Sequence, residues 1–264
     1  MNLILFRSLQ ENYSLNSSDP RHRHIVSVLR AGRGDTLRIG VVDGPEGVGT
    51  VVDTDRTGTV IRAQWTHSRK SALPLDVLVG HPRPPVLQRL WRDLATARVR
   101  SVHIFAGDLG EPNYLGSSVW DKLEERLLEG MSQGHHTARP DVYRYARLDE
   151  TLKAMSPVLE DGEYRYYGGL GGDAVPLAAA LIDMLNHRNG ARDERGDISV
   201  SVCIGPERGL SPRETDILET RGFRGMSLGD SVYRTESAVH GMVIPFASVL
   251  CGPSVTKKLH CPHG

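Results

Sequence analysis

The amino-acid sequence predicts an α/β protein in which a small β-rich domain precedes a larger parallel sheet covered by helices. Residues 1–70 alternate apolar and polar side chains in short runs that are separated by turns containing Gly and Asp. From Leu75 onward, continuous apolar runs alternate with amphipathic runs of helical period. Between these parts, HSRKSALP (67–74) is polar and ends in proline, which is typical of a linker. We therefore expect two domains, residues 1–72 and 73–264.

The composition is that of a globular chain with no overall bias toward one kind of partner. The 264 residues include 39% hydrophobic and 24% charged side chains, and the formal net charge is zero. We recognise no signal peptide and no apolar run near membrane-spanning length, and expect a cytoplasmic protein without membrane contact. The three cysteines are widely spaced, which favours reduced thiols. Two histidines flank Cys261, but nothing elsewhere completes a ligand set, so we expect no metal site.

Local charge is less even than the total. One group of arginines lies in the first forty residues, and a second lies between residues 83 and 100. The two groups are Arg7, Arg21, Arg23, Arg30, Arg33 and Arg38, and Arg83, Arg89, Arg92, Arg98 and Arg100. A solvated face is the simplest explanation for either group taken alone.

The first domain is expected to contain strands over 37–44, 48–55 and 57–65, whose spacing suggests a small barrel. Before them, RHRHIVSVLR (21–30) places His24, Val28 and Leu29 at helical spacing, and a Gly-containing stop follows.

The second domain alternates strands and helices, as a parallel α/β sheet does. The expected strands are 75–80, 101–107, 164–168, 198–205 and 225–229, and the expected helices are 86–99, 120–133, 175–186, one from Ser211 onward, and 235–250.

The first motif that could carry chemistry is GGLGGDA (168–174), which contains a loose GxGxxA from Gly169. It could form the dinucleotide-binding loop of a nicotinamide-dependent enzyme, with Asp193 or Glu194 near the distance expected for a ribose-binding acid. Two features argue against this interpretation. The preceding GEYRYY (162–167) is short and polar for a central parallel strand, and both acids lie in a charged loop.

The second motif is IGPERGLSPRE (204–214), which follows the apolar run ISVSVCI. Proline lacks the N–H that a strand needs, so Gly205-Pro206 ends the strand abruptly. Ser211, Pro212 and Glu214 form a capping box that starts a helix. That role leaves Glu207 to Gly209 unexplained, and ligands of α/β proteins bind at the carboxyl ends of parallel strands.

The third motif is SLGDSVYRTESAVHGMV (227–243), in which a strand ends at Gly229 and a helix capped by Thr235 begins. Arg234 and Glu236 place a cation and an anion at the helix start. Glu236 suits the helix dipole, and Arg234 could simply pair with it. Taken alone, this motif fits a structural role and a functional role about equally.

Together, GPERGLSPRE and the SLG–YRTESA segment resemble the RsmE family of 16S rRNA uracil-N3 methyltransferases, which belong to the SPOUT class. HIVSVLRAGRGD (24–35) also resembles the entry segment of that family. The resemblance implies a SPOUT-type parallel sheet with a C-terminal trefoil knot, preceded by a PUA-like β-barrel. Arg208 stands where the family usually has glycine, and Asp230 to Tyr233 replace a stretch that usually contains proline and arginine.

The resemblance further implies that S-adenosyl-L-methionine binds to three loops, about 168–172, 205–210 and 228–235. The implied cofactor-binding residues are Gly169, Leu170, Ile204, Gly205, Pro206, Glu207, Gly209, Leu228, Gly229, Val232, Tyr233, Thr235 and Ala238. Arg234 would stabilise charge on the uracil oxygens, because its fork can address a carbonyl or a phosphate. Glu236 would orient Arg234 or help to remove the N3 proton.

The implied partners are 16S rRNA or the small ribosomal subunit, and a second copy of the chain that forms a homodimer through the knot domain. Arg21, Arg23, Arg30 and Arg83 would contact RNA phosphates. Two alternatives stay open beside this reading: a SPOUT methyltransferase that modifies another RNA nucleotide, and an RNA-binding relative that has lost catalysis.

Overall fold

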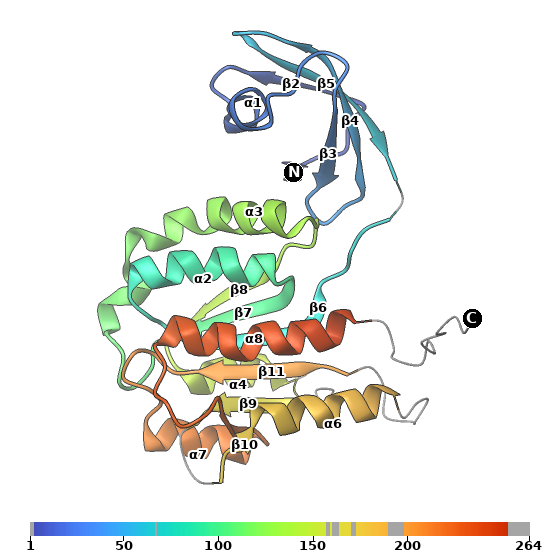
Figure 1. Cartoon of the computed structure of the whole chain (residues 1–264). Helices are drawn as coiled ribbons and strands as arrows, with labels where there is room; N and C mark the ends of the chain where they lie inside the picture. The colour runs from blue at the N-terminus through green and yellow to red at the C-terminus, as the bar shows by residue number, and fades with distance from the viewer. Residues whose placement is uncertain are drawn as a thin grey trace, which may run out of the picture. The chain divides into compact units, whose positions relative to one another are not determined.

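The computed structural model describes residues 3–66, 68–156, 159, 164–169, 173–189 and 198–252. The chain forms two compact units, each with its own sheet (Figure 1). The first unit contains residues 1–72, 91–98 and 123–139, and the second contains 73–90, 99–122 and 140–264. The two later segments of the first unit are largely helical, and the sequence places them in the second domain. The division into domains 1–72 and 73–264 therefore stays a prediction.

The first unit is built on a mixed five-stranded sheet with the order β1-β3-β4-β5-β2. Its strands are β1 (Ile4–Phe6), β2 (Asn12–Asn16), β3 (Thr36–Val41), β4 (Glu46–Thr54) and β5 (Gly58–Trp65). β1 pairs with β3 in parallel, and the other neighbours are antiparallel. The three strands expected from the sequence are confirmed. Inward-facing side chains such as Leu37, Ile39 and Ile61 form the core, and the rings of Phe6 and Tyr13 stack between the two edge strands.

The helix before β3 differs from the expectation. It consists of α1 (Pro20–His24) followed by a π-helical turn, η1 (Ile25–Leu29), and ends at Arg30 in the left-handed conformation. The expected helical segment is present, but its buried side differs from the spacing of His24 and Val28, because Val28 is 65% exposed whereas Ile25 is buried and Leu29 packs against the core. A π-turn has more residues per turn than an α-helix, so a 3.6-residue period assigns its inward face incorrectly.

The second unit is built on a parallel seven-stranded sheet with the order β10-β12-β9-β11-β6-β7-β8. Its strands are β6 (Leu73–Gly80), β7 (Val99–Phe105), β8 (Asp141–Tyr145), β9 (Tyr164–Gly168), β10 (Val175–Pro176), β11 (Val200–Ile204) and β12 (Arg224–Ser227). The predicted α/β class is confirmed. The sequence argument that YRYY is too polar for a central strand was wrong, because β9 lies between β12 and β11.

Helices follow most of these strands, together with two 3₁₀ segments. The helical segments outside η1 and α1 are α2 (Pro84–Thr96), η2 (Pro112–Gly116), η3 (Ser118–Lys122), α3 (Leu123–Gly134), α4 (Leu148–Ala154), α6 (Leu177–Asn189), α7 (Pro212–Thr220) and α8 (Thr235–Cys251). The sequence did not indicate β8 and α4. The strand β8 is an edge strand whose five residues are all at least partly exposed, so it lacks an apolar run. No helix in the described ranges is both long enough and apolar enough to cross a membrane.

Two helical layers cover the sheet of the second unit. On one face, Leu78, Tyr167 and Cys203 pack against side chains of α4 and α7. On the other face, α8 contacts β6 and β11, and the ring of Phe246 stacks on that of Tyr166 (Figure 1). Strand residues that alternate between the two faces are therefore buried on both sides, as central parallel strands are.

The arrangement of β9, β10 and β12 departs from a simple sequential order. β9 and β10 are joined directly by residues 169–174, yet β12 lies between them and pairs with both. A strand from a later part of the chain thus lies between two strands that follow each other closely in sequence.

A buried polar network lies within the sheet on β6 and β7. Ser101 Oγ donates to Asp76 Oδ1 at 2.6 Å, and Arg100 Nε donates to the same oxygen at 3.0 Å. His103 Nε2 lies 2.8 Å from Ser101 Oγ. Because the serine proton is directed to Asp76, the histidine is the donor to Ser101. Burial, only partly offset by the charge of Asp76, lowers the pKa of His103 to about 4.

We expect this histidine to make stability depend on pH. Above pH 6.5 neither the folded nor the unfolded state protonates it, and its contribution is fully present. As the pH falls from 6.5 to about 4, the unfolded chain binds a proton that the folded chain does not. The free energy of unfolding should therefore fall by about 3 kcal/mol over this window. Urea denaturation of the wild type and His103→Gln should show that this pH-dependent loss is absent from the variant; equal slopes would contradict the assignment.

Candidate functional site

The loop that follows β11 is held at the carboxyl edge of the sheet by close backbone packing. Gly205 and Pro206 are buried, whereas Glu207, Arg208 and Gly209 are exposed. A Cβ at position 80, the last residue of β6, would lie 2.3 Å from Pro206 Cδ. A Cβ at position 205 would lie 2.5 Å from the carbonyl carbon of Gly209. Only glycine permits both approaches, so the shape of the loop is set by residues 80 and 205.

The same loop turns back on itself and leaves backbone open to a ligand. The N–H of Gly209 donates to the carbonyl of Pro206 at 2.8 Å, and Gly209 has a φ of +80°. Gly229, in the loop after β12, has a φ of +127°. A Cβ at either position would meet no atom within 4 Å. These two loops therefore present bare backbone beside open space.

The capping box at the start of α7 is confirmed, and it does more than begin a helix. Ser211 Oγ accepts from the N–H of Glu214, and Glu214 Oε2 accepts from the N–H of Ser211. The second carboxylate oxygen, Oε1, accepts from the N–H of Asp108 at 3.0 Å. Ser211 Oγ in turn donates to Asp108 Oδ2 at 2.7 Å. The segment after β7 is thereby tied to the loop after β11.

The loop after β12 leads into α8 and contains Arg234. Arg234 is exposed, and its guanidinium makes no hydrogen bond or ion pair with the described residues. Arg234, and not Thr235 as we expected, is the N-cap of α8, and its side chain makes no capping bond. Thr235 is instead the first helical residue and is buried. Arg234 is thus placed at a helix start with its charge available to a ligand.

Glu236 is paired with Arg89, a member of the second arginine group that the sequence did not link to this site. Its Oε1 lies 3.6 Å from Arg89 Nη2, and no contact with Arg234 is found among the described side chains. In the neighbouring loop, Glu207 Oε1 accepts from the N–H of Arg83 at 2.8 Å. Arg83 and Arg89, in the segment that follows β6, therefore contact Glu207 and Glu236. In the sequence, the arginine group between residues 83 and 100 was the only sign that this segment belongs to the candidate site.

The remaining predicted cofactor residues lie on the same edge of the sheet. β12, β9 and β11 are adjacent and parallel, so the loops that follow them leave from one edge. Ile204 is buried at the end of β11, Leu228 and Ala238 are partly buried, and Val232 and Tyr233 are exposed. Gly169 donates its N–H to the carbonyl of Met226 at 2.9 Å. Leu170 lies outside the described residues.

The arginines predicted to contact RNA differ in how free they are. Arg21 is bound within the first unit: it forms a two-point ion pair with Asp19, donates to the carbonyl of Leu5 at 3.2 Å, and lies over the ring of Phe6. Its phosphate contact stays a prediction, although these bonds explain the residue structurally. Arg23, Arg30 and Arg83 are exposed.

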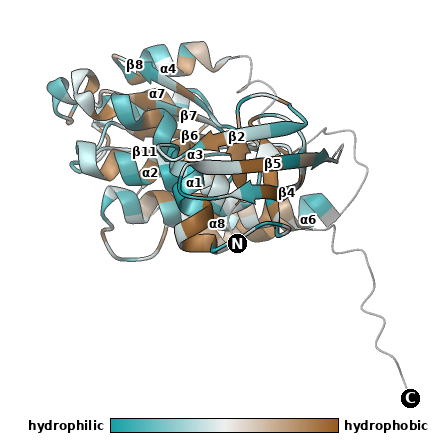
Figure 2. Ribbon diagram, turned by 90° about the horizontal axis from the view of Figure 1, so that it is seen from above, coloured by the Kyte–Doolittle hydropathy of each residue, from teal (hydrophilic) through white to brown (hydrophobic). Residues whose placement is uncertain are grey.

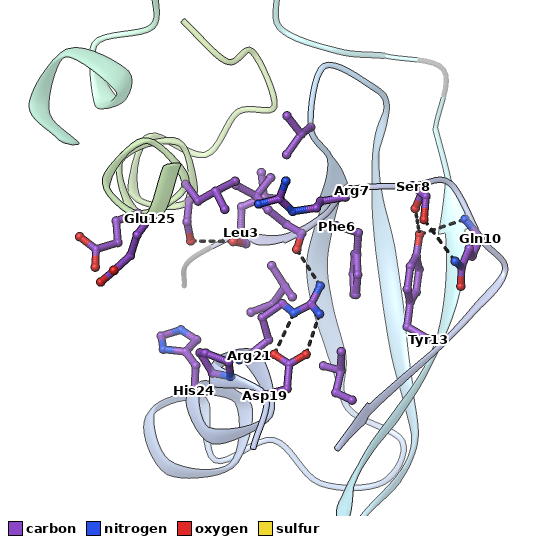
Figure 3. Close-up of a pocket in the computed structure, with 18 of the residues that line it drawn as sticks. Leu3, Phe6, Arg7, Ser8, Gln10, Tyr13, Asp19, Arg21, His24 and Glu125 are labelled. Carbon is purple, nitrogen blue, oxygen red and sulfur yellow. Dashed lines mark hydrogen bonds and ion pairs between the residues drawn. The ribbon is translucent and has the colours of Figure 1, made fainter. Parts of the chain in front are cut away.

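The first unit also contains a cavity of about 1000 Å³ beside Arg21 (Figure 3). Strand β1 forms one wall and α3 another, and they are joined where Ser132 Oγ donates to the carbonyl of Leu3 at 2.6 Å. The lining mixes Arg7 and Arg21 with Asp19, Glu125 and Glu129. These opposing charges give the cavity no preference for a phosphate or another anion.

Comparison with known proteins decides the family. Residues 69–244 match the RNA methyltransferase domain family, and this range includes all three loops. The chain belongs to this family. The RNA methyltransferase domain thus spans the whole carboxyl edge described above.

Individual relatives extend the likeness to nearly the whole chain. The ribosomal RNA small subunit methyltransferase E of Treponema pallidum is 25% identical over 244 residues, which cover 90% of this chain and 87% of that protein. The methyltransferase E 1 of Borreliella burgdorferi is 26% identical over 250 residues, covering 94% and 97%. The crystal structure of the Neisseria gonorrhoeae methyltransferase E bound to S-adenosyl methionine has a TM-score of 0.69 at 14% identity, covering 94% and 96%. At that identity the structural likeness shows a shared fold.

Proposed function

We propose that this RNA methyltransferase transfers a methyl group from S-adenosyl-L-methionine to N3 of a uridine in 16S ribosomal RNA. The observation that carries the proposal is the pair of glycine turns at one edge of the sheet, with a free arginine beside them. Full-length relatives named as small-subunit ribosomal RNA methyltransferases support the substrate. A structural neighbour bound to S-adenosyl methionine supports the cofactor.

The loops suit a cofactor that is recognised mainly by backbone groups. Open space beside Gly209 and Gly229 lets a ligand approach the chain closely. Ile204, Gly205, Pro206 and the partly buried Leu228 supply walls without charge. When bound, S-adenosylmethionine supplies an electrophilic methyl group on a positively charged sulfur. The chain has only to hold the acceptor nitrogen in line with that group.

Arg234 is the residue that we assign to the acceptor. Uracil N3 becomes nucleophilic once its proton passes to solvent water, and the negative charge then spreads onto the two ring oxygens. A guanidinium can donate to such an oxygen through two N–H groups and stabilise the charge as it develops. Glu236 is held by Arg89, so we assign it a role in positioning the start of α8. Arg23 and Arg30 would add phosphate contacts that strengthen docking of the RNA.

The proposal is tested by the modified nucleosides of 16S rRNA in a strain that lacks the chain. We expect 3-methyluridine to disappear and to return when purified protein and S-adenosylmethionine are added to small subunits from that strain. Loss of a different methylated nucleoside would favour the alternative of another target nucleotide. Unchanged methylation would favour an RNA-binding protein without catalysis.

We also propose that two copies associate through α6 and α8. These helices contact each other and expose apolar side chains, of which Ile182 and Ile244 are each 58% exposed. In Figure 2, α8 is coloured largely as hydrophobic. Such an apolar surface beside a site is suited to a permanent contact with a second copy.

Light scattering tests this association. We expect the wild type to have twice the 29.0 kDa mass of the chain, and the double variant Ile182→Asp/Ile244→Asp to be monomeric, because each copy would bury two carboxylates in the contact. Val28→Asp is the matched control, since Val28 is 65% exposed in the first unit. A monomeric wild type would refute the proposal.

A further inference from the structure

A group of aromatic rings lies at the carboxyl end of β6, next to the loop after β11. The ring of His81 lies 5.6 Å from that of Tyr114 and 5.9 Å from that of Trp120, measured between centroids. The guanidinium of Arg144 lies 4.9 Å from the centre of the Trp120 ring. We call these four residues the His81 cluster. None of them has a role in the cofactor loops or in the assignment of Arg234.

His81 is the unusual member, because it is only 2% exposed and one of its nitrogens has no partner. Nδ1 lies 2.7 Å from the carbonyl of Pro82, and a carbonyl can only accept, so Nδ1 carries the proton. Nε2 is therefore an acceptor, and no described residue donates to it. An unpaired buried acceptor destabilises the free protein, so its presence points to a ligand that donates to it. Burial also lowers the pKa of His81, which keeps the ring neutral.

The cluster is adjacent to the proposed site of methyl transfer. Gly80, which precedes His81, packs directly against Pro206. Arg83, two residues after His81, donates its N–H to Glu207. Arg83, Arg144 and Arg208 are exposed along this edge, together with the carboxylate of Glu207.

We propose that the His81 cluster binds a single-stranded base of the RNA substrate that neighbours the methylated nucleotide. Tyr114 and Trp120 stack on the base, and His81 Nε2 accepts a hydrogen bond from one of its N–H groups. Aromatic stacking of this kind is how proteins hold unpaired RNA bases. The inference rests on the proposed function for the identity of the substrate, and it adds a recognition site outside the cofactor loops.

Binding has to expose Nε2, which the free protein covers. Tyr114 and Trp120 are partly exposed and lie on the short 3₁₀ segments η2 and η3. Ser117 joins the two segments: its N–H donates to the carbonyl of Tyr114 at 3.1 Å, and its carbonyl accepts from the N–H of Trp120 at 3.5 Å. Arg144 also donates to the carbonyl of Leu115 in η2 at 2.8 Å. Displacement of these two turns away from His81 opens Nε2 to the base. The base then satisfies the acceptor that the free protein leaves unpaired.

The test measures the KM for small ribosomal subunits and, separately, the affinity for S-adenosylmethionine. Trp120→Ala and Tyr114→Ala should each raise KM by about tenfold or more, as removal of one stacking partner does. His81→Phe keeps a ring and loses the acceptor, and should raise KM less. Trp120→Phe should stay near the wild type. Tyr143→Ala is the matched control, because Tyr143 is a 44% exposed aromatic residue on β8.

The outcomes separate this inference from the proposed function. If the wild type methylates small subunits and the cluster variants keep a wild-type KM, the inference is wrong and the function stands. If the variants lose cofactor affinity to the same extent as they raise KM, the cluster stabilises the fold and does not bind a base, and the inference is wrong. If the wild type shows no methylation, binding of a labelled single-stranded RNA replaces KM, and unchanged affinity of Trp120→Ala overturns the inference.

Discussion

Replacing Arg234 with alanine should reduce the rate of methyl transfer on the order of 10²- to 10³-fold, as loss of one donor to a developing oxyanion does. The guanidinium is exposed and free of partners among the described residues, so its removal breaks no internal bond. The fold and the binding of S-adenosylmethionine should therefore be retained. Single-turnover methylation measures the first quantity, and calorimetry with S-adenosylmethionine measures the second.

Arg208→Ala is the matched control for this prediction. Arg208 is also an exposed arginine at the same edge of the sheet, but it lies in the loop after β11. It should lower affinity for RNA without a large loss in the single-turnover rate. If Arg234→Ala retains full activity, or if it fails to bind S-adenosylmethionine, the role assigned to Arg234 is wrong.

Replacing Gly205 with alanine should weaken cofactor binding by a mechanism that involves no lost functional group. The added Cβ would lie 2.5 Å from the carbonyl carbon of Gly209 and 2.7 Å from the backbone nitrogen of Leu210. Both atoms are main chain, so the turn has to open to relieve the overlap. Overlaps of this kind cost about 1–3 kcal/mol, which corresponds to a loss of affinity of roughly 5- to 150-fold if the bound state requires the closed turn.

Gly32→Ala serves as the control for this substitution. A Cβ at position 32 meets only Asp35 Oδ2 at 4.0 Å, and the site lies in the first unit. Calorimetry should show an unchanged affinity for S-adenosylmethionine in this variant. An equally unchanged affinity in Gly205→Ala would mean that the turn is not part of the cofactor site.

The sequence was sufficient for most elements because their signals are local. Apolar runs marked β6, β7 and β11, and the capping box marked the start of α7, since each depends only on residues close together in the chain. The π-turn at 25–29 and the edge strand β8 were missed because they lack such a local signal. The π-turn changes the helical period, and β8 has no apolar run to detect.

The glycine turns and the exposed arginine of the candidate site were likewise indicated by the motifs, through Gly205, Gly209, Gly229 and Arg234. Its partners were decided by the tertiary structure. Glu236 pairs with Arg89, Glu207 accepts from Arg83, and Glu214 holds Asp108, across separations of more than a hundred residues. Such contacts depend on which parallel strands are neighbours, and strand order leaves no local pattern in the chain. The unpaired nitrogen of His81 belongs to the same class, because only packing shows that a buried acceptor lacks a donor.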